Sequence, residues 1–287
     1  DVVSNPEFLR EGSDIDDWVH PDRIVIGDSN GKKVAAKVAK LYKVLGAPIL
    51  ITNLETAEMI KYASNSYLAT QISFINSLSC ICEKVGADVD EVADGMKQDK
   101  RIGQHAFLSA GLGYGGSCFP KDVEALIQIA KDYSVRFGIL EETEVVNKEQ
   151  RQRFVAKINK KLGNLKGKKI AVWGIAFKPK TDDIRMAPAI TILEALSSLG
   201  AKITAFDPVA EENLLQIMPD IKFAKNAVEA CKDADALAIV TGWDEFRQID
   251  LSKIKKIMKK PVIFDGRNIY NPEEMKEEGF EYHSIGR

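Results

Sequence analysis

The second half of the chain alternates strand-like and helix-like segments, and this alternation restricts the fold more than any other feature of the sequence. After Lys166, the apolar runs KIAVWG, KITAFD, ADALAIV and PVIFDG are separated by helix-like stretches such as APAITILEALSSLG and NAVEACKDA. Strands that alternate with helices in this way form parallel sheets covered by helices on both faces. The pattern therefore predicts an α/β fold with a Rossmann-like, doubly wound C-terminal domain.

A long helix is expected ahead of this region. Thr52 and Glu55 have the spacing of a capping box, and apolar residues then recur at helical spacing with no breaker before Gly86. A helix over 54–85 would be about 48 Å long at ~1.5 Å per residue. Helices of this length usually span domains or build subunit interfaces. We therefore expect a homodimer or a higher homo-oligomer that forms through this helix.

The first 51 residues predict an incomplete α/β domain. Residues 22–27 and 48–51 are strand-like and flank a helix-like stretch at 30–45, which together make a β-α-β remnant. The chain opens on Asp1 without a Met or a signal-like leader, as if it entered a domain at the end of a strand. We therefore expect part of a longer protein, divided into an N-terminal remnant over 1–51, a central helical dimerisation domain over 52–150, and a C-terminal domain over 151–287.

Composition narrows the range of partners. With 287 residues, 45% hydrophobic and 29% charged, the chain has the composition of a folded protein, and no apolar run is long enough to cross a bilayer. A net charge of -2 gives no sign of a nucleic acid or an anionic membrane as partner. The four cysteines lack the paired spacing of a zinc site, so we expect no metal and a reducing, cytoplasmic location. They are Cys80, Cys82, Cys118 and Cys231.

The glycine-rich loop GLGYGGSCFPKD contains the first candidate for chemistry. Its cysteine, Cys118, lies just before a helix that Asp122 is expected to open. A helix N-terminus favours a thiolate, which is the form that acts as a nucleophile. The alternative is a small buried side chain in a loop, which is the commoner fate of a free cysteine.

Two pairs of polar residues are the next candidates. Lys61 and Asn65 are one helical turn apart, so an ammonium and an amide lie side by side where they could hold an oxyanion or a water. Glu7 and Glu11 follow a strand end and could act as a base and a residue that orients it. Either pair could equally belong to an ordinary solvated surface.

The second half also suggests a nucleotide site. Gly174 follows one predicted strand and Asp207 ends the next, as in nucleotide-binding β-α-β units. The fingerprint G-x-G-x-x-G is absent after this first strand, so a dinucleotide lacks its usual cradle there. Lys178, Lys180 and Arg185 offer positive charges suited to a nucleotide diphosphate, although a solvated loop would also explain them.

Taken together and in order, five segments resemble the UDP-glucose 6-dehydrogenase family of nucleotide-sugar dehydrogenases over nearly the whole chain. GGSCFPKD and AFKPKTDD are the most specific. The resemblance implies oxidation of UDP-glucose to UDP-glucuronate by two hydride transfers to NAD, through a cysteine-bound thiohemiacetal and thioester. The segments are SNPEFLREGSDIDDWVHPDRIVIG, ETAEMIKYASNSYLA, GLGYGGSCFPKD, VWGIAFKPKTDDIRMAPA and FDGRN.

The same resemblance implies roles for individual residues. Cys118 would be the nucleophile and Lys61 the oxyanion stabiliser, while Asn65 and Asp122 would position the water and Glu7 would assist thioester hydrolysis. The expected substrate-binding residues are Phe8, Leu9, Arg10, Glu11, Arg101, Tyr114, Gly115, Phe177, Lys178 and Arg267, with Arg101 reaching into the site of a neighbouring subunit.

The sequence departs from the family in three places. The glycine-rich part of the family's NAD-binding domain is expected to precede the first residue here, with only the tail of that domain over 1–51. The main NAD site is therefore expected in a missing part, and the chain alone is expected to be inactive. Arg10 stands where relatives commonly have a small residue, and Ser109 where some have a lysine. The alternatives are a dehydrogenase of GDP-mannose or UDP-N-acetylmannosamine, and a non-catalytic module for nucleotide-sugar binding or oligomerisation.

Overall fold

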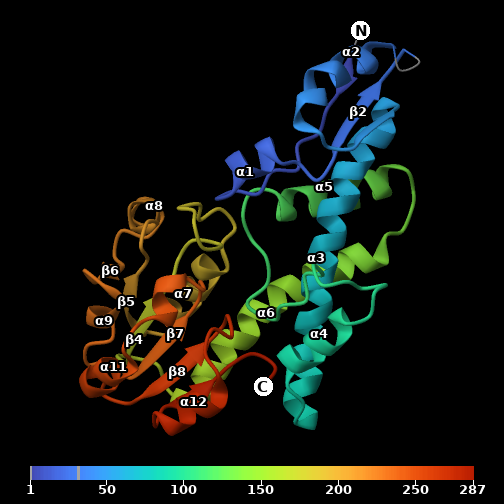
Figure 1. Cartoon of the computed structure of the whole chain (residues 1–287). Coiled ribbons are helices and arrows are strands. Elements are labelled where there is room, and N and C mark those ends of the chain that lie inside the picture. The colour runs from blue at the N-terminus through green and yellow to red at the C-terminus, as the bar shows by residue number, and fades with distance from the viewer. Residues whose placement is uncertain (1, 31–32) are drawn as a thin grey trace. The chain divides into compact units, whose positions relative to one another are not determined.

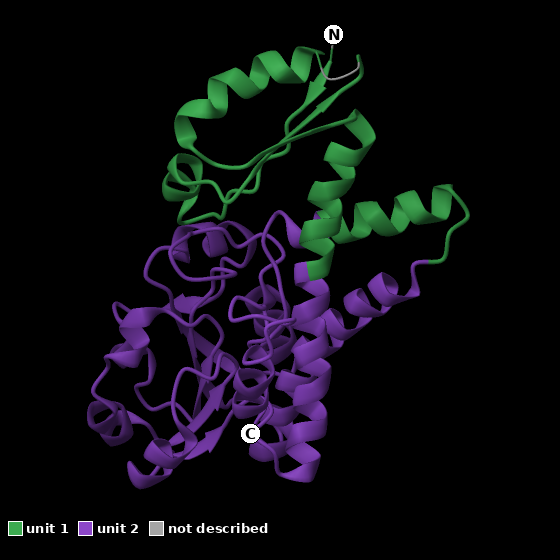
Figure 2. Ribbon diagram, turned by 45° about the vertical axis from the view of Figure 1, so that its right-hand side comes forward, with its two compact units in different colours: residues 1–67, 122–136 green, residues 68–121, 137–287 purple. Residues whose placement is uncertain are grey.

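The computed structural model describes residues 2–30 and 33–287, which divide into two compact units (Figures 1 and 2). Unit 1 comprises residues 1–67 and 122–136, and unit 2 comprises residues 68–121 and 137–287. Two helices, α3 (Leu54–Val85) and α5 (Phe119–Asp132), contribute residues to both units. Each unit is described below by itself.

Unit 1 contains a three-stranded sheet in the order β1-β2-β3. Strand β2 is antiparallel to β1 and parallel to β3, and helix α2 connects the two parallel strands as the expected β-α-β unit. Its small core is formed by Ile24, Ile26, Ala35 and Ala39. The elements of this unit before α3 are β1 (Val3–Ser4), α1 (Asp14–Val19), β2 (Ile24–Asp28), α2 (Lys33–Tyr42), η1 (Lys43–Leu45) and β3 (Ile49–Thr52).

Helix α3 confirms the predicted 54–85 helix, but its N-terminus is capped differently from the prediction. The side chain of Asn53, not Thr52, accepts the backbone N–H of Thr56 at 2.9 Å. Both residue types can cap a helix, and the one immediately before the first helical residue takes the role here. At the other end Gly86 adopts a left-handed conformation (φ 76°), which ends the helix.

Unit 2 contains a six-stranded sheet in the order β6-β5-β4-β7-β8-β9, and every adjacent pair of strands is parallel. The order reverses beside β4, as in a doubly wound sheet, so the predicted fold class is confirmed. Helices α4 (Val89–Lys97) and α6 (Gly138–Leu162) precede it. The remaining elements are β4 (Lys169–Trp173), α7 (Pro188–Ser198), β5 (Lys202–Phe206), α8 (Glu211–Ile217), β6 (Lys222–Phe223), α9 (Ala227–Ala230), β7 (Ala236–Ile239), α10 (Asp244–Arg247), α11 (Leu251–Ile257), β8 (Val262–Asp265), α12 (Pro272–Glu277) and β9 (Glu281–His283).

Alternate side chains of β4 enter the two cores of this sheet. Ile170 and Val172 pack in one apolar cluster, whereas Ala171 and Trp173 pack in the other. Successive side chains of a strand point to opposite faces, so a strand that is apolar throughout must be covered on both. This explains why the run KIAVW shows no alternation of polar and apolar residues.

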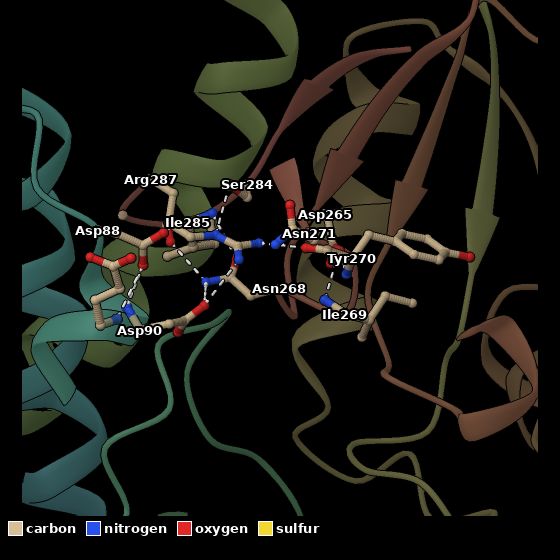
Figure 3. Close-up of polar contacts among 12 residues, drawn as sticks. Asp88, Asp90, Asp265, Asn268, Ile269, Tyr270, Asn271, Ser284, Ile285 and Arg287 are labelled. Atoms are coloured by element: carbon tan, nitrogen blue, oxygen red, sulfur yellow. Dashed lines mark hydrogen bonds and ion pairs between the residues drawn. The ribbon is translucent and has the colours of Figure 1, made fainter. Parts of the chain in front are cut away.

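The last residues of the chain tie helix α4 to the sheet within unit 2 (Figure 3). Asn268 donates to the Asp90 carboxylate at 3.1 Å and accepts the N–H of Ile285 at 3.0 Å. Arg287 forms an ion pair with Asp90 at 3.2 Å and donates to the Tyr270 carbonyl at 2.9 Å. Burial raises the pKa of Asp90, and the charge of Arg287 opposes that rise.

Over residues 2–30 and 33–287, no helix is both long and apolar enough to cross a membrane. The same residues contain no cluster of three or more His, Cys, Asp or Glu side chains that could hold a metal ion.

Candidate active site

Cys118 directly precedes the first residue of α5. The helix begins at Phe119 and not at Asp122, so the prediction that Asp122 opens it is wrong. Pro120 is the signal that could have placed the start earlier, because proline fits the first turn of a helix, where N–H groups have no partner within the helix. The Cys118 side chain is partly exposed, and its Sγ lies 3.6 Å from the Ser117 hydroxyl. The free N–H groups of such a helix start attract anions.

Lys61 and Glu7 meet in unit 1. The Lys61 ammonium donates to the backbone carbonyl of Glu7 at 2.6 Å and to its carboxylate at 3.1 Å. The other carboxylate oxygen of Glu7 accepts the N–H of Leu9 at 2.7 Å. Lys61 and Glu7 are therefore in direct contact, although they lie 54 positions apart in the sequence. Both are predicted site residues.

Asn65 and Asp122, to which the resemblance gives a shared role, are in contact within unit 1. The Asn65 amide donates to the Asp122 carboxylate at 2.5 Å, and the two residues are only 8% and 1% exposed. Asn65 follows Lys61 by one turn of α3, while Asp122 lies in the first turn of α5. A buried carboxylate with a fixed amide partner is suited to orient a water or another small polar group.

The loop after β1 gives its predicted residues different surroundings. The Phe8 ring lies beneath the Arg23 guanidinium, 4.0 Å from the ring centroid, with the Lys61 ammonium at 5.5 Å. Arg10 is held by Asp17, which accepts its backbone N–H at 2.7 Å and pairs with its guanidinium. The hydrogen bond from Arg10 lowers the pKa of Asp17. Leu9 and Glu11 are both half-buried.

The glycine-rich loop of unit 2 is shaped by the side chains packed against it. Gly113 and Gly116 have φ angles of 87° and 82°, which disfavour any other residue. A Cβ on Gly113 would collide with the Asn147 carboxamide, and one on Gly116 would lie 2.8 Å from the Phe177 ring. Together with Gly111 these glycines have the G-x-G-x-x-G spacing of a dinucleotide fingerprint, but protein atoms fill the space beside them. The Gly116 N–H donates to the Arg185 carbonyl at 2.9 Å.

Five of the predicted substrate-binding residues lie in this loop or beside it, and one of them is the buried Gly115. Tyr114 is 4% exposed, and its hydroxyl donates to Glu144. The Arg267 guanidinium donates to the Phe177 carbonyl at 3.1 Å, and its Nη1 would lie 3.2 Å from a Cβ on Gly111. The Lys178 ammonium lies 5.4 Å from the centroid of the Phe177 ring. Burial lowers the pKa of Arg267.

Arg101 and Arg185 each form a fork with a nearby aspartate in unit 2. Arg101 donates to both oxygens of Asp99, with its Nε at 3.0 and 3.2 Å. Arg185 pairs in the same way with Asp183, through contacts of 2.8 to 3.1 Å. The charge of Arg185 is therefore already paired with a carboxylate in its own loop.

The carboxylates at the strand ends hold the loops of the sheet. Asp207, just after β5, accepts five N–H groups, from the backbones of Ile175, Ala176, Val209 and Ala210 and from the Trp243 indole, at 2.6 to 3.1 Å. Asp265, at the end of β8, accepts three backbone N–H groups and the Tyr282 hydroxyl, at 2.7 to 3.2 Å. Both residues are buried, and the loops around them supply the partners of their carboxylate oxygens.

At the end of β2 in unit 1, the place where a dinucleotide could bind is taken by the protein's own groups. The Asp28 carboxylate accepts the N–H groups of Asn30, Val34 and Ala35 at 2.8 to 3.0 Å, so it occupies the start of α2. A Cβ on Gly27 would lie 2.6 Å from the Asn53 carbonyl. This strand end is closed by the protein itself. In residues 2–30 and 33–46, which the structure describes, the end of β2 therefore has no free backbone N–H groups arranged to bind a pyrophosphate.

Three segments of the chain match three domains of one family. Residues 1–46 match the NAD binding domain of the UDP-glucose/GDP-mannose dehydrogenase family, residues 55–149 its central domain, and residues 171–272 its UDP binding domain. The three matches follow one another along the chain and all belong to this one family.

Individual relatives agree with this result. The chain is 50% identical over its full length to UDP-glucose 6-dehydrogenase TuaD of Bacillus subtilis, of which it covers 62%. It is 44% identical over 99% of its length to UDP-glucose 6-dehydrogenase of Rickettsia prowazekii, of which it covers 67%. Among solved structures, a UDP-glucose dehydrogenase from Pyrobaculum islandicum superposes with a TM-score of 0.90 at 34% identity, over 99% of this chain and 62% of that one.

The chain belongs to the UDP-glucose/GDP-mannose dehydrogenase family, and the resemblance read from its motifs is confirmed. It spans 62% of the length of the Bacillus relative. The individual roles of the site residues remain predictions.

Proposed function

We propose that this chain is part of an enzyme that oxidises UDP-glucose to UDP-glucuronate in two steps, with NAD as the hydride acceptor. The observation that carries the proposal is the position of Cys118, partly exposed at the start of α5 in a chain 50% identical to a UDP-glucose 6-dehydrogenase. A thiolate there is suited to trap an aldehyde so that it can be oxidised again without leaving. A pure binding module has no need of such a thiol.

The proposed chemistry starts from the sugar's primary alcohol. A first oxidation gives an aldehyde, and the Cys118 sulfur adds to its carbonyl carbon to form a thiohemiacetal. A second oxidation gives a thioester, and attack by water releases the carboxylate and returns the thiol. Each oxidation removes a hydride and a proton, and NAD supplies the acceptor for both hydrides. It is bound in this proposal by residues other than the closed end of β2.

The side chains of this chain have separate roles in the proposal. Lys61 stabilises the oxyanion at each tetrahedral stage, and its contact with Glu7 sets the ammonium in place. Asn65 and Asp122 position the attacking water through their buried hydrogen bond. Glu7 assists hydrolysis of the thioester. Tyr114, Phe177, Lys178 and Arg267 belong to the nucleotide-sugar site in unit 2.

Location and assembly are parts of the same proposal. The four cysteines are free thiols, which fits a reducing cytoplasm. Helix α3 exposes Phe74, Ile81 and Val85 by 52 to 70%, which fits a homodimer formed through this helix. Sedimentation as a monomer at concentrations far above those of an enzyme assay would contradict the dimer.

The test uses a protein that joins this chain to a complete NAD-binding domain. We expect two NADH per UDP-glucose consumed, and no complete oxidation when Cys118→Ser is introduced, because an alcohol is a far weaker nucleophile than a thiolate. GDP-mannose and UDP-N-acetylmannosamine are the comparison substrates. Turnover of either in preference to UDP-glucose would refute the substrate, and turnover of none would favour a non-catalytic binding module.

A further inference from the structure

Helix α6 of unit 2 directs four buried polar side chains toward one loop. Glu144, Asn147, Gln150 and Arg151 recur at helical spacing and are each no more than 9% exposed. Burial of polar groups is costly unless they are hydrogen-bonded, so a run of four on one helix needs partners. We call these four residues the α6 clamp. None of them was selected from the sequence as a site residue.

The clamp binds both backbone polar groups of Tyr114. The Asn147 carboxamide accepts the Tyr114 N–H at 2.8 Å and donates to the Tyr114 carbonyl at 3.2 Å. The Arg151 guanidinium donates to the same carbonyl at 2.7 Å. The orientation of the peptide groups on both sides of Tyr114 is therefore set by two side chains of α6.

The clamp also holds the residues around this position. Gln150 donates to the Gly111 carbonyl at 2.8 Å, and Glu144 accepts the Tyr114 hydroxyl. Gly113 lies against the Asn147 carboxamide so closely that a Cβ there would collide with it. Each of these three clamp residues therefore contacts a different residue of the loop.

The charges within the clamp balance each other. Burial lowers the pKa of Arg151, and the carboxylate of Glu144 opposes that shift. A buried guanidinium kept charged by a nearby carboxylate remains a strong donor. Its bond to the Tyr114 carbonyl is thus of the charge-assisted kind, and a neutral side chain cannot replace it.

We propose that Asn147 and Arg151 are positioning residues for the nucleotide sugar, because they fix the Tyr114-Gly115 backbone that leads into Cys118. The inference rests on the proposed function, since the affinity for a nucleotide sugar is its readout. The two residues act through the loop and touch no reacting atom. Substitution of Asn147 or Arg151 removes a hydrogen bond to the Tyr114 backbone. Every side chain that is predicted to contact the ligand stays in the chain.

The test measures how UDP-glucose protects Cys118 from alkylation by iodoacetamide in the 287-residue chain. Asn147→Ala and Arg151→Met are compared with Arg151→Lys, which retains a charged donor. Thr143→Val is the matched control, because Thr143 is a buried polar residue of α6 whose hydroxyl bonds to Ile139 and Thr70 and not to the loop. The thermal midpoint of each variant is recorded alongside.

We expect the half-protecting concentration of UDP-glucose to rise about tenfold or more in Asn147→Ala and Arg151→Met, as expected for a lost buried hydrogen bond. Arg151→Lys and Thr143→Val should stay within about threefold of the unsubstituted chain. If Thr143→Val raised the half-protecting concentration as much as the clamp variants do, for the same fall in thermal midpoint, the effect would come from lost stability alone. That result would overturn the inference. Unchanged affinity in Asn147→Ala and Arg151→Met would overturn it as well.

Failure of the proposed function gives a different result. If UDP-glucose leaves Cys118 of the unsubstituted chain unprotected but another nucleotide sugar protects it, the substrate is wrong, and the same variants tested with that sugar decide the positioning role. If no nucleotide sugar protects Cys118 of the unsubstituted chain, both the function and the positioning role are refuted.

Discussion

Replacement of Asp207 by asparagine tests whether this carboxylate holds the sheet together or waits for a ligand. Its two oxygens accept five N–H groups, two on Oδ1 and three on Oδ2, and the residue is 2% exposed. Asp207→Asn turns one oxygen into an NH₂ group, which cannot accept, so at least two buried donors lose their partner. At about 1–3 kcal/mol for each unsatisfied group, the loss in the free energy of unfolding should be about 2–6 kcal/mol.

The assay is urea unfolding at pH 7, followed by the fluorescence of Trp173 and Trp243 in a Trp18→Phe background. Trp173 is fully buried in the sheet and the Trp243 indole donates to Asp207, so the signal reports on unit 2. Asp233→Asn is the control, because the Asp233 side chain is 64% exposed and its ion pair with Lys169 is worth about 0–1 kcal/mol. A loss below about 1 kcal/mol in Asp207→Asn, combined with weaker nucleotide binding, would refute the structural role and restore Asp207 as a ligand.

Two further predictions concern a thiol and an acid. Burial raises the pKa of Cys231 to about 12, so iodoacetamide at pH 8 should modify Cys118 while Cys231 stays unmodified, as mass spectrometry of the peptides can show; faster labelling of Cys231 would contradict this. Because Arg10 lowers the pKa of Asp17 below its ordinary value of 3.8, their contact stabilises the folded state above pH 3.8 and loses that effect as the pH falls through the folded-state pKa. Asp17→Asn should therefore weaken the acid dependence of stability in this range, measured by thermal unfolding between pH 2 and 6, and an unaltered profile would count against the contact.

The regular parts of the fold could be predicted from the sequence because their signals are local. The helix over 54–85 has an unbroken apolar period and ends at a glycine, and the strands of unit 2 are short apolar runs bounded by turns. The errors occurred at helix starts. Thr52 and Asn53 are both good caps, and only the path of the chain decides between them. Asp122 looked like the opening residue of α5, although Pro120 already marked an earlier first turn.

The site was predicted less completely, for a physical reason. Lys61, Asn65 and Cys118 stand in motifs that resemble a known family, so the sequence alone pointed to them. Asn147 and Arg151 look like the polar face of an ordinary amphipathic helix, since their partners lie more than 30 residues away and are backbone atoms. A backbone partner leaves no residue type to recognise, and only the folded chain reveals such a contact.

Two carboxylates at strand ends of the parallel sheet hold its loops through the loop backbone, and we call this set of hydrogen bonds the frame. Asp207 and Asp265 bind mostly backbone N–H groups, which every residue except proline possesses, so they hold their loops whatever side chains those loops carry. Lys178 and Arg267 lie in loops that follow two strands of this sheet, and their side chains supply no acceptor to the frame, although the Arg267 guanidinium also donates to the Phe177 carbonyl. Side chains of these loops can therefore change while the backbone N–H groups and the two carboxylates that hold the loops stay in place.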